Sequence, residues 1–542
     1  MSENRTARFE TANFFKNCAL LLCLIAPSVW MIVTIPPLWR DADAYVQLTE
    51  NPLVVTFWGH APGYSYATKP LLFAGEQWER WQGRASAKHR AESSQPGLTD
   101  TGIWLIIIGQ HLALAAGLFC FLRAVSQFFW VRLALAVAWA TNPMLYTYAH
   151  CLGSETLSSI LTVVLATKGL RLLQDRRQPE WKDWYFFAVI LCFCILARDL
   201  NLGLIALLAV AFVIAWNWNR PGIFRSSKES EKFGLGERRA LYLWSAVVAI
   251  AIGFACVWVE DSLEQNLARK TKLHPHSRIG FTFLWRLNFL DNLSPEARGV
   301  LLGKVAARAH SEKARQIIAL LGQMQAEKAD MSSGPFMQRA ILLFDGPQWE
   351  ELDRALNEMA FAFLLPPTPE HLQATSTDLI HAVTMPPTEI TNYLFATTTY
   401  YFEHREELHA VANLVTFRGA TADQIRAIPS QHLYFRLWQG VRYSRIFLVW
   451  IIALAGFVFM ARRRGINPGA VVGFSFALTA VGVLICVVAC VLHEIEPRFA
   501  LTMWQTLLLS LSLLLGKTVD LLILEPARHR AGGVQHRFLS TA

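Results

Sequence analysis

The sequence predicts an all-α polytopic membrane protein with about ten transmembrane helices, an interfacial helix in the first external loop and a helical extracytoplasmic insert. First, the 542 residues are 53% hydrophobic and only 17% charged, with a mean hydropathy of +0.30, which is too apolar for a soluble globular protein. Second, a helix rises ~1.5 Å per residue and the hydrocarbon core is ~30 Å thick, so apolar runs of roughly 17–25 residues are candidate spans. We expect spans at 14–38, 103–122, 131–148, 157–173, 184–197, 202–216, 241–259, 446–461, 470–492 and 499–515.

The basic residues of the short loops predict how the spans are oriented. Cytoplasmic loops carry an excess of lysine and arginine. By this rule the cytoplasmic segments are the N-terminal tail and the loops 123–132, 168–182, 217–240 and 462–464. Basic loops on both flanks of 184–216 require two crossings there, hence a hairpin that turns at 198–201. We therefore expect an integral, multi-pass protein of the plasma or inner membrane with both termini cytoplasmic.

The spans divide the chain into three parts. Residues 1–259 form an N-terminal membrane module with spans 1–7 and a first external loop at 39–101. Residues 260–445 form an extracytoplasmic insert, and residues 446–542 hold spans 8–10 and a cytoplasmic tail. The insert is predicted to be helical, with Ser294 as an N-cap and Pro295 at a first helical position.

The unusual polar residues near the membrane fall on the predicted outer side. Asp41 and Asp43 follow the first span, whereas the middles of the spans are nearly free of charge. A proton- or ion-coupled transporter would keep ionisable residues near the bilayer midplane. Three interpretations of the aspartates stay open: a solvated interfacial loop, a D-x-D metal site of the kind used with nucleotide sugars, and an enzyme site for a lipid-borne substrate. The second is disfavoured because nucleotide sugars are cytoplasmic.

Lys69 and Pro70 open a further apolar stretch of the same loop. Proline is well placed as the first residue of a helix, and Leu71, Phe73 and Trp78 suggest that this helix lies in the membrane interface. Lys69 would then sit at a helix N-terminus, at the depth of lipid phosphates. The alternative is a lysine that only extends its ammonium group to the headgroups.

Two more polar groups are candidates. Arg198 and Asp199 lie at the predicted hairpin turn, where they could bind a ligand, pair with each other or cap the two arms. His150 and His493 are best interpreted as interfacial hydrogen-bonding residues.

Four short motifs, taken in order, resemble the GT-C superfamily of membrane glycosyltransferases. They are Asp41 with Tyr45, Lys69 with Pro70, Glu155 after the third span, and Arg498 with Phe499 at the last span. The nearest resemblance is to the branch of the protein O-mannosyltransferases and lipid A aminoarabinose transferases. Two positions depart from that pattern: Ala42 follows Asp41 where the family usually has an acidic residue, and Thr68 precedes Lys69 where glutamate is common.

The resemblance implies an inverting transfer of a sugar from a polyprenyl-phosphate carrier to an extracytoplasmic acceptor, which is a lipid, a glycan or a protein. Asp41 or Asp43 would be the catalytic base, and Lys69, Arg198 and Arg498 would bind the donor phosphate. Supporting roles fall to Tyr45, Glu155, Asp199 and Glu494.

No cofactor is implied, and a divalent metal is left open by the acidic pair alone. The expected partners are the donor, the acceptor and membrane lipids, with no nucleic acid, because the net charge of +9 is spread over short loops. The rival hypothesis is a lipid or polysaccharide transporter, or a non-catalytic envelope protein, whose outer loops only bind cargo.

Overall fold

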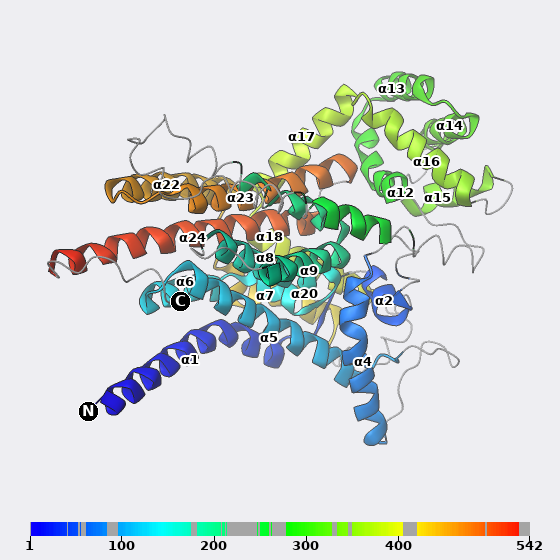
Figure 1. Ribbon diagram of the computed structural model, residues 1–542. Coiled ribbons are helices and arrows are strands. Elements are labelled where there is room, and N and C mark those ends of the chain that lie inside the picture. The colour runs from blue at the N-terminus through cyan, green and yellow to red at the C-terminus, as the bar shows by residue number, and fades with distance from the viewer. Residues whose placement is uncertain are drawn as a thin grey trace.

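Helices make up most of the described chain in the computed structural model (Figure 1). The structure describes residues 2–40, 42–52, 55, 61–83, 96–174, 181–207, 209–211, 213, 247, 250–259, 262, 278–327, 333–344, 349–404, 420–493 and 496–530. Within these residues, the one sheet has two short parallel strands, β1 (Leu38–Trp39) and β2 (Cys151–Leu152). The predicted all-α class is therefore confirmed, apart from this small sheet.

The helices fall into two sets along the chain. The set up to residue 205 comprises α1 (Ser2–Thr34), α2 (Ala42–Thr49), α4 (Gly63–Trp81), α5 (Asp100–Val125), α6 (Phe129–Ala140), α7 (Pro143–Ala149), α8 (Ser154–Gln174), α9 (Trp181–Ala197) and the 3-10 helix η1 (Asp199–Ile205). The second set comprises α12 (Arg278–Leu284), the 3-10 helix η2 (Trp285–Asn292), α13 (Pro295–Arg308), α14 (Glu312–Ala326), α15 (Ser333–Leu342), α16 (Trp349–Leu364), α17 (Pro369–Thr384), α18 (Pro387–Glu403), α20 (Ala422–Gln431), α21 (Leu433–Arg436), α22 (Tyr443–Arg463), α23 (Gly469–Leu492) and α24 (Pro497–Arg530).

Five of the described helices are long and apolar enough to cross a membrane. They lie at Asn13–Thr34, Asp100–Val125, Tyr443–Arg463, Gly469–Leu492 and Pro497–Ile523. The prediction of a membrane protein is supported at this level. Shorter apolar helices occur at Phe129–Ala140, Tyr185–Ala197 and Ile250–Val259, and parts of 202–216 and 241–259 lie outside the described residues, so the number of ten spans stays a prediction.

The long helices pack side by side into one body with a continuous hydrophobic core. Helix α24 lies against both α22 and α23, and α5 lies against α4 and α8 (Figure 1). Gly482 marks a very close approach, because a Cβ atom there would overlap the side chain of Thr506 on α24. Glycine is therefore required where α23 crosses α24.

The range predicted as an insert packs in two places. Helices α12 to α16 surround a core of their own, which includes Phe283, Leu356 and Phe363, and they stand apart at the upper right of Figure 1. Helices α17, α18 and α20 instead bury residues such as Leu394 and Phe395 in the core of the membrane body. The second half of the range is therefore part of that body.

Two predicted helix starts can be compared with the structure. Ser294 accepts a hydrogen bond from the amide of Ala297 and Pro295 is the first residue of α13, so that prediction is confirmed. The prediction that Pro70 begins the first-loop helix is wrong, because α4 begins at Gly63, after Pro62, and continues through Pro70. Because proline has no N–H, the helix loses one hydrogen bond, the one that the carbonyl of Tyr66 would accept from residue 70. Tyr66 is exposed.

Candidate functional site

The pairing of β1 with β2 brings Arg40 onto Glu155. Arg40 directly follows β1, and Glu155 lies in the first turn of α8, just after β2. Arg40 Nη1 donates to both carboxylate oxygens of Glu155, at 2.9 and 2.8 Å, and lies 3.3 Å from Ser154 Oγ. Both side chains are buried, and Glu155 is only 2% exposed. The site thus contains a buried arginine that directly precedes Asp41 in the sequence.

Two more arginines reach the same carboxylate from distant parts of the sequence. Arg198 Nη2 lies 3.7 Å and Arg498 Nη1 lies 3.8 Å from Glu155 Oε1. Each guanidinium also lies over the ring of Phe499, at 5.4 and 5.2 Å from its centroid. We call Arg40, Glu155, Arg198 and Arg498 the Glu155 cluster.

The turn that presents Arg198 is fastened by Asn201. Helix α9 ends at Ala197, and the buried Asn201 side chain donates from Nδ2 to Ser158 Oγ at 2.8 Å and to the carbonyl of Cys194 at 2.7 Å. These bonds tie the turn to α8, the helix that carries Glu155. The start of α4 packs on the other side of the turn, since a Cβ atom on Gly63 would lie 2.5 Å from the carbonyl oxygen of Leu196.

The cluster carries three guanidinium groups around one carboxylate. Burial alone would raise the pKa of Glu155, but the charges of Arg40, Arg198 and Arg498 outweigh it and lower that pKa to about 2. The carboxylate is therefore ionised at neutral pH. In the described part of the chain, the Arg198 guanidinium has this ion pair and the ring of Phe499 as partners, but no hydrogen bond. Such a group can accept an additional anion.

A second carboxylate, Glu496, borders the cluster. Its Oε2 lies 2.6 Å from Arg498 Nε and accepts a hydrogen bond of 2.6 Å from the Tyr393 hydroxyl of α18. His493 Nε2 lies 3.8 Å from Glu496 Oε1, and its ring stacks on Trp285. Arg498 is thus held between Glu155 and Glu496.

Lys69 lies apart from these ion pairs. Its Nζ donates a 2.6 Å hydrogen bond to the carbonyl of Leu48, in the last turn of α2. Burial lowers the pKa of Lys69 to about 8, partly opposed by Glu50. Because α4 begins at Gly63, the expected place of Lys69 at a helix N-terminus is wrong. Among the described residues, Lys69 forms no hydrogen bond or ion pair with the Glu155 cluster.

The remaining predicted site residues are placed only in part. Asp41 and Glu494 lie outside the described residues. Asp43 is in α2 and Asp199 begins η1, but their side chains also lie outside what the structure describes. Tyr45 is half-buried in α2, and its carbonyl accepts a hydrogen bond from Thr49. The structure therefore brings together Glu155, Arg198 and Arg498 from the predicted set.

Arg40, Glu496 and Tyr393 were missed as site residues. The pairing that places Arg40 uses strands of two residues, which leave no periodic pattern in a sequence. Glu496 and Tyr393 meet only because α18 packs against the start of α24. The sequence did hold one signal for two of them: Arg40 directly precedes the candidate Asp41, and Glu496 lies two residues before the candidate Arg498.

His150 is a buried structural residue. Its Nε2 lies 2.9 Å from the carbonyl of Ile35, and its Nδ1 lies 3.1 Å from His111 Nε2. Burial lowers the pKa of His150 to about 4, so its ring is neutral at physiological pH. The backbone carbonyl of His150 also accepts from the amide of Leu38, which fixes the approach to β1.

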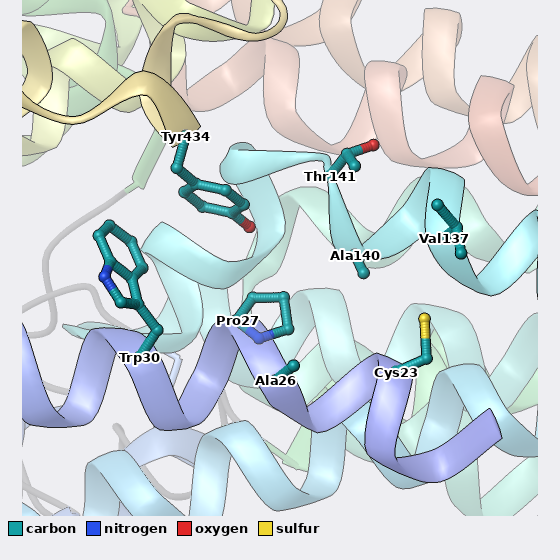
Figure 2. A pocket seen from close by; sticks show the side chains of 8 residues that line it. All are labelled: Cys23, Ala26, Pro27, Trp30, Val137, Ala140, Thr141 and Tyr434. Carbon is teal, nitrogen blue, oxygen red and sulfur yellow. The ribbon is translucent and has the colours of Figure 1, made fainter. Parts of the chain in front are cut away.

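A cavity of about 400 Å³ lies elsewhere, between α1 and α6 (Figure 2). Trp30 and Tyr434 stand at one end, and Ala26 and Pro27 of α1 face Ala140 of α6 across it (Figure 2). Its lining contains none of the Glu155 cluster. Within the described residues there is also no group of three or more His, Cys, Asp or Glu side chains that could hold a metal ion.

Comparisons of this chain with protein-family models, with curated proteins and with solved structures each found no match.

Proposed function

We propose that this chain is an integral-membrane glycosyltransferase of the GT-C type, which moves a sugar from a polyprenyl-phosphate carrier to an acceptor outside the cytoplasm. The observation that carries the proposal is the convergence of Arg40, Arg198 and Arg498 on one buried carboxylate. Arginine is well suited to phosphate, because its planar fork can donate two parallel hydrogen bonds to phosphate oxygens. The cluster keeps a surplus of positive charge after Glu155 is counted.

The proposed reaction is a single displacement at the anomeric carbon. An acceptor hydroxyl oxygen attacks that carbon, the bond from the carbon to the phosphate oxygen breaks, and the hydroxyl proton passes to a carboxylate. Asp41 or Asp43 is that base, as the resemblance to the family implies. Arg198 and Arg498 stabilise the negative charge that gathers on the departing phosphate.

Arg40 links the two halves of this chemistry. It binds Glu155 through Nη1 and directly precedes Asp41 in the chain. The proposed base Asp41 and the arginine that holds the phosphate site together are therefore consecutive residues of the chain. Close positioning of a base and a binding group accounts for a large part of enzymatic rate enhancement.

Lys69 has an indirect place in this proposal. Its hydrogen bond to Leu48 ties α4 to α2, the helix that contains Asp43. We retain it as a donor-binding residue, since a bound phosphate could compete for its ammonium group.

The membrane topology is likewise part of the proposal. The loop charges support a multi-pass protein with both termini in the cytoplasm and with the site on the outer side.

The test is donor turnover by the purified protein in lipid vesicles. We expect the wild-type chain to consume a polyprenyl-phosphate sugar when an acceptor is present. Arg498→Ala should slow this reaction roughly 10- to 150-fold, the equivalent of a charged phosphate contact of about 1.5–3 kcal/mol. Arg442→Ala, in which the removed side chain bonds the carbonyl of Thr384, is the matched control. Movement of the intact donor across the vesicle membrane without cleavage would instead support a transporter.

A further inference from the structure

Helix α18 contacts the backbone beside Arg40. The hydroxyl of Thr398 accepts a 2.9 Å hydrogen bond from the amide of Trp39, the residue before Arg40. The same oxygen lies 2.9 Å from the carbonyl of Trp39 and 2.7 Å from that of Leu394, and it donates its single proton to one of them. This contact joins positions 359 residues apart in the chain.

The same helix also holds the segment beside Arg498. The Tyr393 hydroxyl donates to Glu496 Oε2 at 2.6 Å, and that oxygen lies 2.6 Å from Arg498 Nε. The partly buried Glu496 is thereby held near Nε of Arg498, whereas Glu155 lies near Nη1 of the same guanidinium. Tyr393 acts on Arg498 through Glu496.

Thr398 differs from three other threonines of α18, because its hydroxyl also bonds outside the helix. Thr391, Thr397 and Thr399 hydrogen-bond to carbonyls one turn earlier in their own helix. Such bonds are ordinary in helices and hold nothing outside them. Thr398 has the same internal bond available and, in addition, binds Trp39.

We propose that α18, from the segment between the membrane spans, is a structural part of the donor-phosphate site, with Thr398 and Tyr393 as positioning residues. The inference rests on the proposed function, since the anion is the phosphate of the donor. Thr398 fixes the backbone that carries Arg40, and Tyr393 fixes Arg498 through Glu496. One helix therefore positions both Arg498, which binds the phosphate, and Arg40, which holds Glu155 in the same cluster.

Both hydroxyls should contribute to the affinity of the site for phosphate. At metal sites, hydrogen-bonding partners that orient a ligating residue contribute about 10- to 100-fold to affinity or activity, and we expect an effect of the same order for side chains that orient phosphate-binding arginines. Loss of either hydroxyl should therefore weaken phosphate binding while all three arginines remain in the chain. A part played only in folding would lower thermal stability and leave the affinity of the folded fraction unchanged.

The test measures the Kd of polyprenyl monophosphate for the full-length protein in nanodiscs by calorimetry. We expect Tyr393→Phe and Thr398→Val to raise Kd about 10- to 100-fold, and Thr398→Ser, which keeps the hydroxyl, to restore most of the affinity. Thr399→Val is the matched control, because it removes a neighbouring buried hydroxyl that, among the described residues, bonds only within α18. It should change Kd by less than about twofold.

A double-mutant cycle separates positioning from general damage. If Tyr393 acts through Arg498, Tyr393→Phe should have little further effect on Kd in an Arg498→Ala background. Equal weakening in both backgrounds, or a Kd for Tyr393→Phe and Thr398→Val like that of the control, would overturn the inference. If Arg498→Ala itself binds polyprenyl monophosphate as tightly as the wild type, the phosphate site of the proposed function fails, and the inference fails with it.

Discussion

Glu155 balances part of the charge of three arginines in a largely buried site. Its carboxylate receives two hydrogen bonds from Arg40 and stands within 4 Å of Arg198 and Arg498. Removing one partner of a buried ion pair leaves an uncompensated charge, which is more costly than the pair itself is stabilising. At the scale of single residues, Glu155 therefore serves two purposes: it holds the arginines together, and it leaves them a net positive charge for a ligand.

Replacement of Glu155 tests both purposes. Glu155→Gln should lower the free energy of unfolding by about 3–5 kcal/mol, because three guanidinium groups then repel one another. Added inorganic phosphate should stabilise the variant more than the wild type. Thermal unfolding in detergent, with and without phosphate, measures both effects. Glu389→Gln, which removes a partly exposed partner of His381, is the control and should be nearly neutral. An unchanged melting temperature in Glu155→Gln would contradict this account of the cluster.

The same residue gives a pH dependence with a defined sign. Folding lowers the pKa of Glu155 from its ordinary value of 4.5 to about 2. The stability that Glu155 contributes is therefore fully present above pH 4.5 and is lost as the pH falls toward 2. Wild-type protein should lose stability over that range more steeply than Glu155→Gln, and parallel curves would count against the assigned pKa.

Lys69 predicts a change at alkaline pH. Because burial lowers its pKa to about 8, the ammonium group becomes neutral as the pH rises through that value. If Lys69 binds the donor phosphate, the affinity of the wild type for polyprenyl monophosphate should fall between about pH 7 and 9. The affinity of Lys69→Arg should stay constant over this range, because arginine remains charged. Binding curves measured across this range decide the point. The same pH dependence in both proteins would remove Lys69 from the donor site.

At the scale of elements, the site is assembled from chain segments that end beside one another. The ends of β1 and α9 and the starts of α8 and α24 each present one charged residue, and α18 packs against two of these segments. Helices and strands position side chains more rigidly than free loops do. The short turn between α9 and η1 is the least regular of these parts, and Asn201 holds it.

Replacement of Asn201 tests that turn. Asn201→Leu removes the hydrogen bonds to Ser158 and to the carbonyl of Cys194 and leaves their buried polar atoms without this partner. We expect a loss of about 1–3 kcal/mol in unfolding free energy. Because Arg198 begins the same turn, phosphate affinity of the folded protein should also decrease. A destabilised variant with wild-type phosphate affinity would show that the turn does not position Arg198.

The elements also show what the sequence could predict. The Ser294 cap follows from local chemistry and the end of α9 near residue 198 from the basic loops on both flanks of 184–216, so both were predictable. Glu155, Arg198 and Arg498 were predicted to share one side of the membrane, and they meet. Arg40 was missed because strands of two residues carry no pattern. The start of α4 was misjudged because a helix tolerates an internal proline where the freed carbonyl belongs to an exposed residue.

At the scale of the whole molecule, the segment between the long helices is divided between two cores. Helices α12 to α16 bury one another, whereas α17, α18 and α20 complete the membrane body. Apolar periodicity is the same in both cases, so the sequence could not distinguish a helix of a separate unit from one that packs on the membrane helices. The proposed phosphate site lies where α18 meets β1 and the start of α24.

The predicted topology of the whole molecule can be tested with reporters. Because loop charges set orientation, fusions at Ser86 and Ser332 should report an external location, and a fusion at Ser227 a cytoplasmic one. Alkaline phosphatase and fluorescent-protein fusions distinguish the two sides. A cytoplasmic signal at Ser86 would place the first loop on the side opposite to the proposed acceptor.

The central claim is that this chain consumes a polyprenyl-phosphate sugar, with Asp41 or Asp43 as base. Mass spectrometry of polyprenyl-phosphate lipids tests it most directly, in cells that lack the chain and are complemented with wild type, Asp41→Asn, Asp43→Asn or the double variant. We expect one polyprenyl-phosphate sugar to accumulate without the chain, to disappear with the wild type, and to accumulate again with the double variant, since general-base catalysis contributes about 10²- to 10⁴-fold to the rate. The single variant that also accumulates it identifies the base. Equal levels of every polyprenyl-phosphate sugar in all these cells would contradict the claim.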